Sequence, residues 1–144
     1  MNILIINGPN LNLLGLREPD IYGKQTYADL VEMIRLEAVS LGVSVTFVQS
    51  NHEGNLVDAI QSAYQTADGI VINPGAYTHT SIALLDALKA VGVPAVEVHI
   101  SDPDQREEFR HVSYIRSACI ATVKGHGLNG YLEALRLLCE KQDE

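Results

Sequence analysis

The sequence predicts an α/β fold in which a five-stranded parallel sheet carries helices on both faces, in one domain over residues 1–144. Short runs rich in Ile and Val alternate with longer segments of helical periodicity, the pattern of strands joined by helical crossovers. The runs are apolar at nearly every position, as is typical of strands buried on both faces. A chain of 144 residues, 47% of them hydrophobic, can bury one core of this kind.

Each expected strand is an apolar run bounded by turn-forming residues. Pro94 favours the start of an extended segment, because proline cannot continue a helix. The expected strands cover residues 2–7, 43–48, 69–73, 94–100 and 118–124. For five such strands the natural arrangement is the flavodoxin-like order 2-1-3-4-5, which places a ligand beyond the carboxyl ends of the strands.

The expected helices are amphipathic and have recognisable ends. Thr26, followed three residues later by Asp29, can form a capping box that opens the first helix. Gly42 and Gly92 stand where helix ends favour glycine. The expected helices cover residues 26–41, 55–66, 80–91 and 130–141.

Composition excludes several classes of function. The net charge of −8 opposes binding to nucleic acid or to an anionic membrane. The apolar start at residues 3–6 is broken at once by Asn7, Gly8 and Pro9, so we expect no signal peptide. Cys119, in an expected strand, and Cys139, in an expected helix, are interpreted as buried thiols of a reducing compartment, which favours the cytoplasm.

Polar residues follow four of the expected strands. They occupy residues 7–23, 49–54, 73–79 and 99–101. Because parallel strands end at one edge of their sheet, these distant segments are expected to converge on one crevice. The convergence predicts a functional site at that edge.

Glu97 and His99 stand two residues apart at the end of the fourth strand, so their side chains project from the same face. A carboxylate beside an imidazole can be an acid/base pair, in which the carboxylate fixes the tautomer and orientation of the ring. The alternative is a structural pair that only satisfies its own hydrogen bonds.

The connection over residues 8–25 is longer than an ordinary βα loop, and loops of this length are often active-site lids. It contains Arg17 and Tyr22. A tyrosine becomes a useful base only where a cation stabilises its phenolate, and Arg17 is a candidate for that cation. The alternative is a tyrosine that merely covers apolar surface.

Arg106 and Arg110 are spaced to share one face of a helix and could form a local anion or polyol site. The alternative is a surface helix with charge pairing. The five histidines fit neither HExxH nor a Cys/His ligand pattern, so we expect no metal site.

Together these segments resemble the type II 3-dehydroquinate dehydratases of the shikimate pathway, and the resemblance extends over nearly the whole chain. The matching motifs are Asn7-Gly-Pro-Asn-Leu-Asn-Leu-Leu-Gly15, Arg17-Glu-Pro-Asp-Ile-Tyr-Gly23, Gln49-Ser-Asn-His-Glu-Gly54, Asn73-Pro-Gly-Ala76 with His79, Glu97-Val-His-Ile-Ser101 and Arg106-Glu-Glu-Phe-Arg-His111.

The resemblance implies an anti elimination of water through an enolate, without a cofactor. Tyr22 would be the base, as a tyrosinate, and Arg17 would depress its pKa. His99 would be the acid that protonates the departing hydroxyl, and Glu97 would orient its ring. Asn10 would hold a water that stabilises the enolate oxygen.

The resemblance also implies the substrate contacts. The backbone amides of Ile100 and Ser101 would bind the substrate carboxylate, and Asn73, His79 and Arg110 would bind its ring hydroxyls. Asp102, directly after Ser101, departs from the Asn that many relatives carry, and its charge could weaken anion binding.

The resemblance further implies a homododecamer of four trimers, in which Asp86 reaches into a neighbouring subunit's site. An alternative from another class is a flavodoxin-like module that binds a small anion or nucleotide without chemistry. A third is a metal-dependent hydrolase that uses the histidines.

Overall fold

The computed structural model describes residues 1–16 and 19–143, and of residues 21 and 22 it describes the backbone alone. The strands β1 (Asn2–Asn7), β2 (Ser44–Gln49), β3 (Gly69–Asn73), β4 (Ala95–His99) and β5 (Ala121–Lys124) form one sheet. Neighbouring strands pair in parallel in the order β2-β1-β3-β4-β5. The predicted fold and strand order are therefore confirmed.

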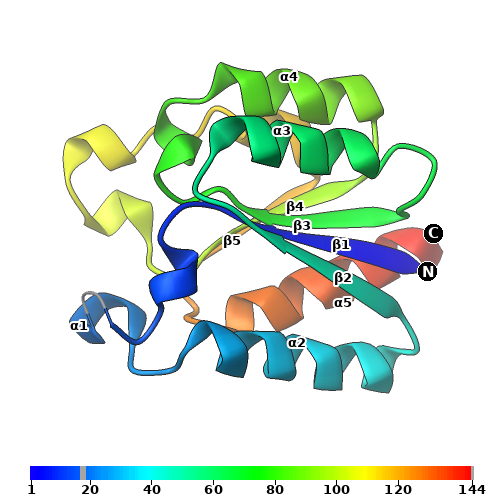
Figure 1. Cartoon of the computed structure of the whole chain (residues 1–144), viewed down its shortest axis with the longest axis horizontal. Helices are drawn as coiled ribbons and strands as arrows, with labels where there is room; N and C mark the ends of the chain where they lie inside the picture. The colour runs from blue at the N-terminus through cyan, green and yellow to red at the C-terminus, as the bar shows by residue number, and fades with distance from the viewer. Residues whose placement is uncertain (17–18, 144) are drawn as a thin grey trace.

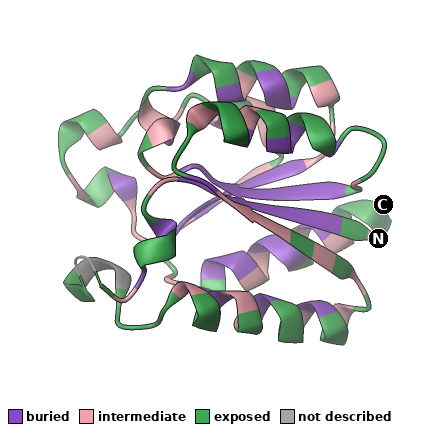
Figure 2. Ribbon diagram, viewed as in Figure 1, coloured by how far each residue is buried: buried purple, intermediate pink, exposed green. Residues whose placement is uncertain are grey.

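Two pairs of helices cover the sheet (Figure 1). α2 (Tyr27–Leu41) and α5 (Asn129–Asp143) lie on one face, and α3 (Glu53–Ser62) and α4 (Ile82–Val91) lie on the other. The alternation of side chains along β1 serves both layers, because Ile3 and Ile5 pack with α2 and α5 whereas Ile6 packs with α3 and α4. Figure 2 shows that the central strands are among the most deeply buried elements.

The helix ends follow the sequence signals. Thr26 Oγ1 accepts a hydrogen bond from Asp29 N, and Asp29 Oδ2 accepts one from Thr26 N, which completes the predicted capping box of α2. Gly42 and Gly92 adopt φ angles of 71° and 66°, the left-handed conformation that ends α2 and α4.

The segment before β5 differs from the prediction. β5 begins at residue 121 rather than 118, and Arg116–Ala118 form a 3₁₀ turn that Cys119 ends. The turn holds Arg116 against Glu97 of β4, a contact that no apolar pattern could indicate. Cys119 therefore lies outside the strand, and both it and Cys139 are free and only partly buried.

The helix predicted around Arg106 and Arg110 is also wrong. Two 3₁₀ turns, Pro103–Gln105 and Glu108–Arg110, occupy this region, and Arg106 between them has an extended backbone. Asp102 accepts a hydrogen bond from the backbone of Asp104 and so starts a short turn instead of a helix. Elsewhere, the helix expected over residues 55–66 runs over Glu53–Ser62.

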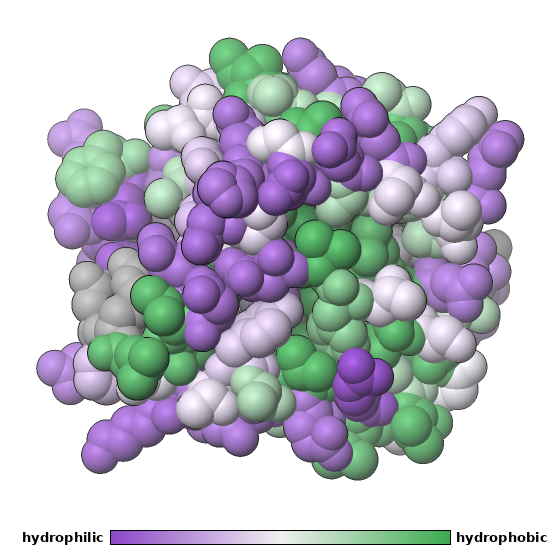
Figure 3. All heavy atoms as spheres, viewed as in Figure 1, coloured by the Kyte–Doolittle hydropathy of each residue, from purple (hydrophilic) through white to green (hydrophobic). Residues whose placement is uncertain are grey.

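The long connection after β1 contains a 3₁₀ turn, Leu11–Leu13, and a short helix, α1 (Pro19–Tyr22). On the face shown in Figure 3, apolar residues gather between α2 and α3, over the edge strand β2. Within the described part of the chain, no helix has the length and apolar character needed to cross a membrane.

The loops that follow β1 and β3 cross in close contact at the carboxyl edge of the sheet. Gly8 lies against Pro74 so closely that an added Cβ would overlap the Pro74 carbonyl group. Gly75 has a φ angle of +60° and lies against the backbone of Pro9. The crossing brings the ends of the two strands to one point, the place where the strand order reverses.

We expect Gly8→Ala to lower the free energy of unfolding by about 2–3 kcal/mol, because backbone must move to admit the methyl group. Gly54→Ala is the matched control, since an added Cβ there meets nothing within 4 Å and Gly54 is helical. That variant should be as stable as the parent or more stable by about 0.5–1 kcal/mol. Urea unfolding measures both, and equal stabilities would contradict the close crossing.

Candidate active site

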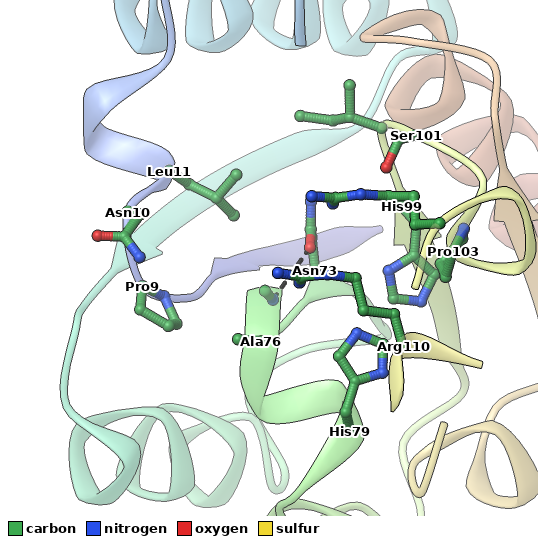
Figure 4. Close-up of a pocket in the computed structure, with 13 residues that line it drawn as sticks. Pro9, Asn10, Leu11, Asn73, Ala76, His79, His99, Ser101, Pro103 and Arg110 are labelled. Atoms are coloured by element: carbon green, nitrogen blue, oxygen red, sulfur yellow. Dashed lines mark hydrogen bonds between the residues drawn. The ribbon is translucent and has the colours of Figure 1, made fainter. Parts of the chain in front are cut away.

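A cavity of about 210 Å³ opens at the carboxyl edge of the sheet, where the sequence predicted a site. Figure 4 shows side chains from separate segments converging on it, among them Asn73, His79, His99 and Arg110. The residues that line it are Pro9, Asn10, Leu11, Asn73, Gly75, Ala76, His79, His99, Ile100, Ser101, Pro103, Arg106 and Arg110.

The cavity carries cationic groups in an acidic chain. Arg106 and Arg110 line it together with two histidines, and none of its described lining residues is a carboxylate. The two arginines thus share a site although the helix predicted to align them does not form. A cavity of this charge favours an anionic ligand.

Glu97 and His99 form the predicted pair. Both side chains are buried, and His99 Nε2 lies 2.6 Å from Glu97 Oε2. Because an ionised carboxylate only accepts, Nε2 carries the proton of this hydrogen bond. The other ring nitrogen, Nδ1, is then the one that can serve a ligand in the cavity.

Glu97 has further partners that sequence reasoning missed. Its oxygens accept hydrogen bonds from Ser113 Oγ at 2.5 Å, Thr122 Oγ1 at 2.8 Å and Arg116 Nε at 2.9 Å. Burial alone would raise the pKa of Glu97, but the hydrogen bonds from His99, Arg116 and Ser113 outweigh burial and hold that pKa far below its ordinary value. Glu97 is therefore an anion at neutral pH.

Asn73 is fixed from beneath by Tyr131, a side chain of α5 that is fully buried. Tyr131 Oη accepts from Asn73 Nδ2 at 2.9 Å and donates to Asn7 Oδ1 at 2.6 Å. Asn73 Oδ1 also accepts from Gly75 N at 3.1 Å. These bonds leave one amide hydrogen of Asn73 to donate into the cavity. Burial raises the pKa of Tyr131 well above its ordinary value and keeps it a neutral phenol.

His79 lines the cavity together with the loop of Asn10. Its Nδ1 donates to the carbonyl of Val112 at 2.7 Å, so Nε2 is the nitrogen that remains for a ligand. Burial lowers the pKa of His79, and the nearby His99 and Arg110 lower it further, so the ring is neutral at pH 7. Arg110 Nε donates to Glu107 at 2.8 Å.

Asn10 is held in place by the loop after β2. It adopts a left-handed conformation with φ 70°, which asparagine tolerates better than most residues. Its backbone N donates to Asn51 Oδ1 at 3.0 Å, and Gln49 Nε2 donates to the carbonyl of Gly8 at 3.1 Å. Tyr77 in turn donates to the Asn51 carbonyl at 3.1 Å.

The remaining predicted residues occupy different places. Ile100 and Ser101 line the cavity, whereas Asp86 is exposed on α4. Tyr22 is the last residue of α1, and its side chain lies outside the described part of the structure, as does the whole of Arg17. Among the described residues, no group of three or more His, Cys, Asp or Glu side chains could hold a metal ion.

Comparisons with known proteins identify the family of the chain. The model of the family Dehydroquinase class II matches residues 1–139. The 3-dehydroquinate dehydratase of Corynebacterium glutamicum is 56% identical over 136 residues, 94% of each chain. That of Caldicellulosiruptor bescii is 53% identical over 142 residues, 98% of each chain. The crystal structure of type II dehydroquinase from Butyrivibrio crossotus superposes with a TM-score of 0.94 at 52% identity, covering 96% of this chain and 97% of that one.

We expect Tyr131→Phe to lower the free energy of unfolding by about 1–3 kcal/mol, because two buried amide groups lose their partner. Tyr64→Phe is the control, since that side chain is 57% exposed. It should change stability by less than about 0.5 kcal/mol. Urea unfolding compares the two, and an equally small effect of both would argue against a structural role for the buried phenol.

Proposed function

The chain belongs to the class II dehydroquinase family, enzymes that dehydrate 3-dehydroquinate in the shikimate pathway, and we propose that it does so with Tyr22 as base and His99 as acid. The observation that best supports this assignment of base and acid is the buried Glu97–His99 pair at the edge of a cationic cavity. The reaction needs a base strong enough to remove a proton beside a ketone and an acid placed at the departing hydroxyl.

His99 is suited to the acid step by the geometry of its ring. Because Nε2 donates to Glu97, only Nδ1 can deliver a proton into the cavity, and it can do so only from the imidazolium form. The anionic Glu97 stabilises that imidazolium. As the enolate returns to a ketone and its electrons form the new C=C bond, the C–O bond breaks, and the Nδ1 proton goes to the leaving hydroxyl. Water is released, and a neutral ring remains hydrogen-bonded to Glu97.

Tyr22 and Arg17 are proposed as the base and its supporting cation. Both belong to the connection after β1, of which Pro9, Asn10 and Leu11 line the cavity. A guanidinium beside the phenol would favour the tyrosinate. The tyrosinate would take the proton next to the ketone, and that proton would return through solvent to His99 to complete the cycle.

The remaining contacts follow from the lining of the cavity. We assign the substrate carboxylate to the amides of Ile100 and Ser101, and its ring hydroxyls to Asn73, His79 and Arg110. Asn10 is proposed to hold the water that stabilises the enolate oxygen. We propose no metal or cofactor, since the chemistry needs only these groups.

A homododecamer of four trimers, working in the cytoplasm, is proposed as the assembled form. Ile82, Phe109 and Val112 expose 55%, 67% and 51% of their surfaces, which favours coverage by another subunit. Asp86 lies one helical turn after Ile82 on α4, and we propose that it reaches a neighbouring site. Sedimentation of the purified protein tests the assembly.

The proposed reaction is tested by mixing the protein with 3-dehydroquinate and following the absorbance of the enone product. Folded protein that gives no signal would defeat the proposal and leave a binding module as the better interpretation. Activity that EDTA abolishes would instead indicate a metal-dependent enzyme.

We expect Tyr22→Phe to lower kcat by about 10²–10⁴-fold with little change in KM, because the hydroxyl acts in the transition state. Tyr64→Phe should retain the activity of the parent, since that tyrosine is exposed on the α3 side of the sheet. Steady-state kinetics measures both variants. Substantial turnover by Tyr22→Phe would show that another group removes the proton.

Asp102→Asn should leave KM within about twofold of the parent. The Asp102 carboxylate caps the turn at Asp104, and Asp102 is not among the described residues that line the cavity. Its other charged neighbour is Lys124, at 3.8 Å. A large fall in KM for the neutral variant would mean that the carboxylate repels the substrate after all.

A further inference from the structure

Arg116 contacts the catalytic pair from outside the cavity. Its Nε donates to Glu97 Oε1 at 2.9 Å and its Nη2 to Oε2 at 3.4 Å. The guanidinium comes from the 3₁₀ turn before β5, and its side chain remains 39% exposed while that of Glu97 is fully buried. Arg116 is not among the residues that line the cavity, so it can act on a substrate only through Glu97 and His99.

His99 can balance the negative charge of Glu97 during only part of the proposed reaction. While the ring is an imidazolium, it balances the charge of Glu97. Once His99 has given its Nδ1 proton to the leaving hydroxyl, that balance is lost, and a fully buried carboxylate without a cation is strongly disfavoured. Glu97 would then tend to take the Nε2 proton while the ring regains a proton at Nδ1 from solvent, which would leave Glu97 neutral and the ring in the other tautomer.

One of the groups around Glu97 must supply a positive charge when His99 is neutral. His99 lies on the same strand, Thr122 on β5, and Ser113 and Arg116 on the segment before β5. The Cys119 thiol is close as well, but burial raises its pKa to about 12, so it is neutral. Of the described groups that donate to Glu97, Arg116 is the one that carries a positive charge throughout the cycle.

We propose that Arg116 is a positioning residue, which keeps Glu97 ionised and aimed at Nε2 of His99 when the ring has lost its proton. The hydroxyls of Ser113 and Thr122 fix the carboxylate plane, and Arg116 supplies a positive charge that is present throughout the reaction. The proposal rests on the function proposed above, because it assumes that His99 is the acid of the reaction.

Arg116→Gln tests the proposal. We expect kcat to fall about tenfold or more with KM within about twofold, because the lost interaction supports the proton-transfer step and not the substrate contacts. Arg116 holds the pKa of Glu97 low, so its removal raises that pKa. Glu97 then becomes protonated at a higher pH, and the acidic limb of the kcat profile moves to higher pH.

Arg136→Gln is the matched control. Arg136 Nε donates to Glu37 at 2.9 Å, the same contact at the same distance, but it joins α5 to α2 away from the cavity. This variant should keep the kcat and pH profile of the parent. Arg116→Lys retains the charge, and should restore the acidic limb to its parental position and recover part of kcat.

The possible results separate the two proposals. If the parent protein does not convert 3-dehydroquinate, the proposed function itself fails. If the parent is active and the acidic limb of the kcat–pH profile of Arg116→Gln lies at the parental pH, the proposed role of Arg116 is overturned. This holds even if kcat and the unfolding temperature fall. If Arg116→Gln does not fold, Arg116→Lys decides: a parental acidic limb supports the proposal, and a limb shifted to higher pH overturns it.

Discussion

The ionised carboxylate of Glu97, buried at the end of β4, is the constraint on which the acid half of the site depends. A parallel strand covered on both faces offers no water to solvate such a group, so the protein must supply each partner. Arg116, Ser113 and Thr122 meet this need from a turn, a loop and a neighbouring strand. The 3₁₀ turn before β5 is the element that carries Arg116 to this carboxylate.

The other half of the site depends on backbone. Close contact between the loops after β1 and β3 leaves no room for a side chain at Gly8, and residues of both loops line the cavity. Polar groups then secure each loop, as Asn51 does for Asn10 and Tyr131 does for Asn73. The cavity therefore has a rigid floor, held by hydrogen bonds from groups that do not face the ligand.

The sequence was sufficient to predict the features that follow from a periodic pattern or from the topology of a parallel sheet. Strand order followed from the alternation of runs, and the Glu97–His99 contact followed from the two-residue period of a strand. Arg116 and Tyr131 were missed because their partners lie far along the chain, and no local pattern records such contacts. The Arg106 helix was predicted from spacing alone, which an aspartate-capped turn overrode. The roles of Arg17 and Tyr22 stay predictions, because they depend on side chains that lie outside the described residues.

The bond between Asn7 and Tyr131 joins residues that are 124 positions apart. During synthesis Asn7 leaves the ribosome well before Tyr131, so the phenol that completes its hydrogen bonding emerges 124 residues later. A nascent chain that lacks α5 therefore has no support under Asn73 and only one of the two helices, α2, that cover this face of β1. The polar floor of the cavity is therefore assembled only when α5 docks, which couples the shape of the site to a contact between distant parts of the chain.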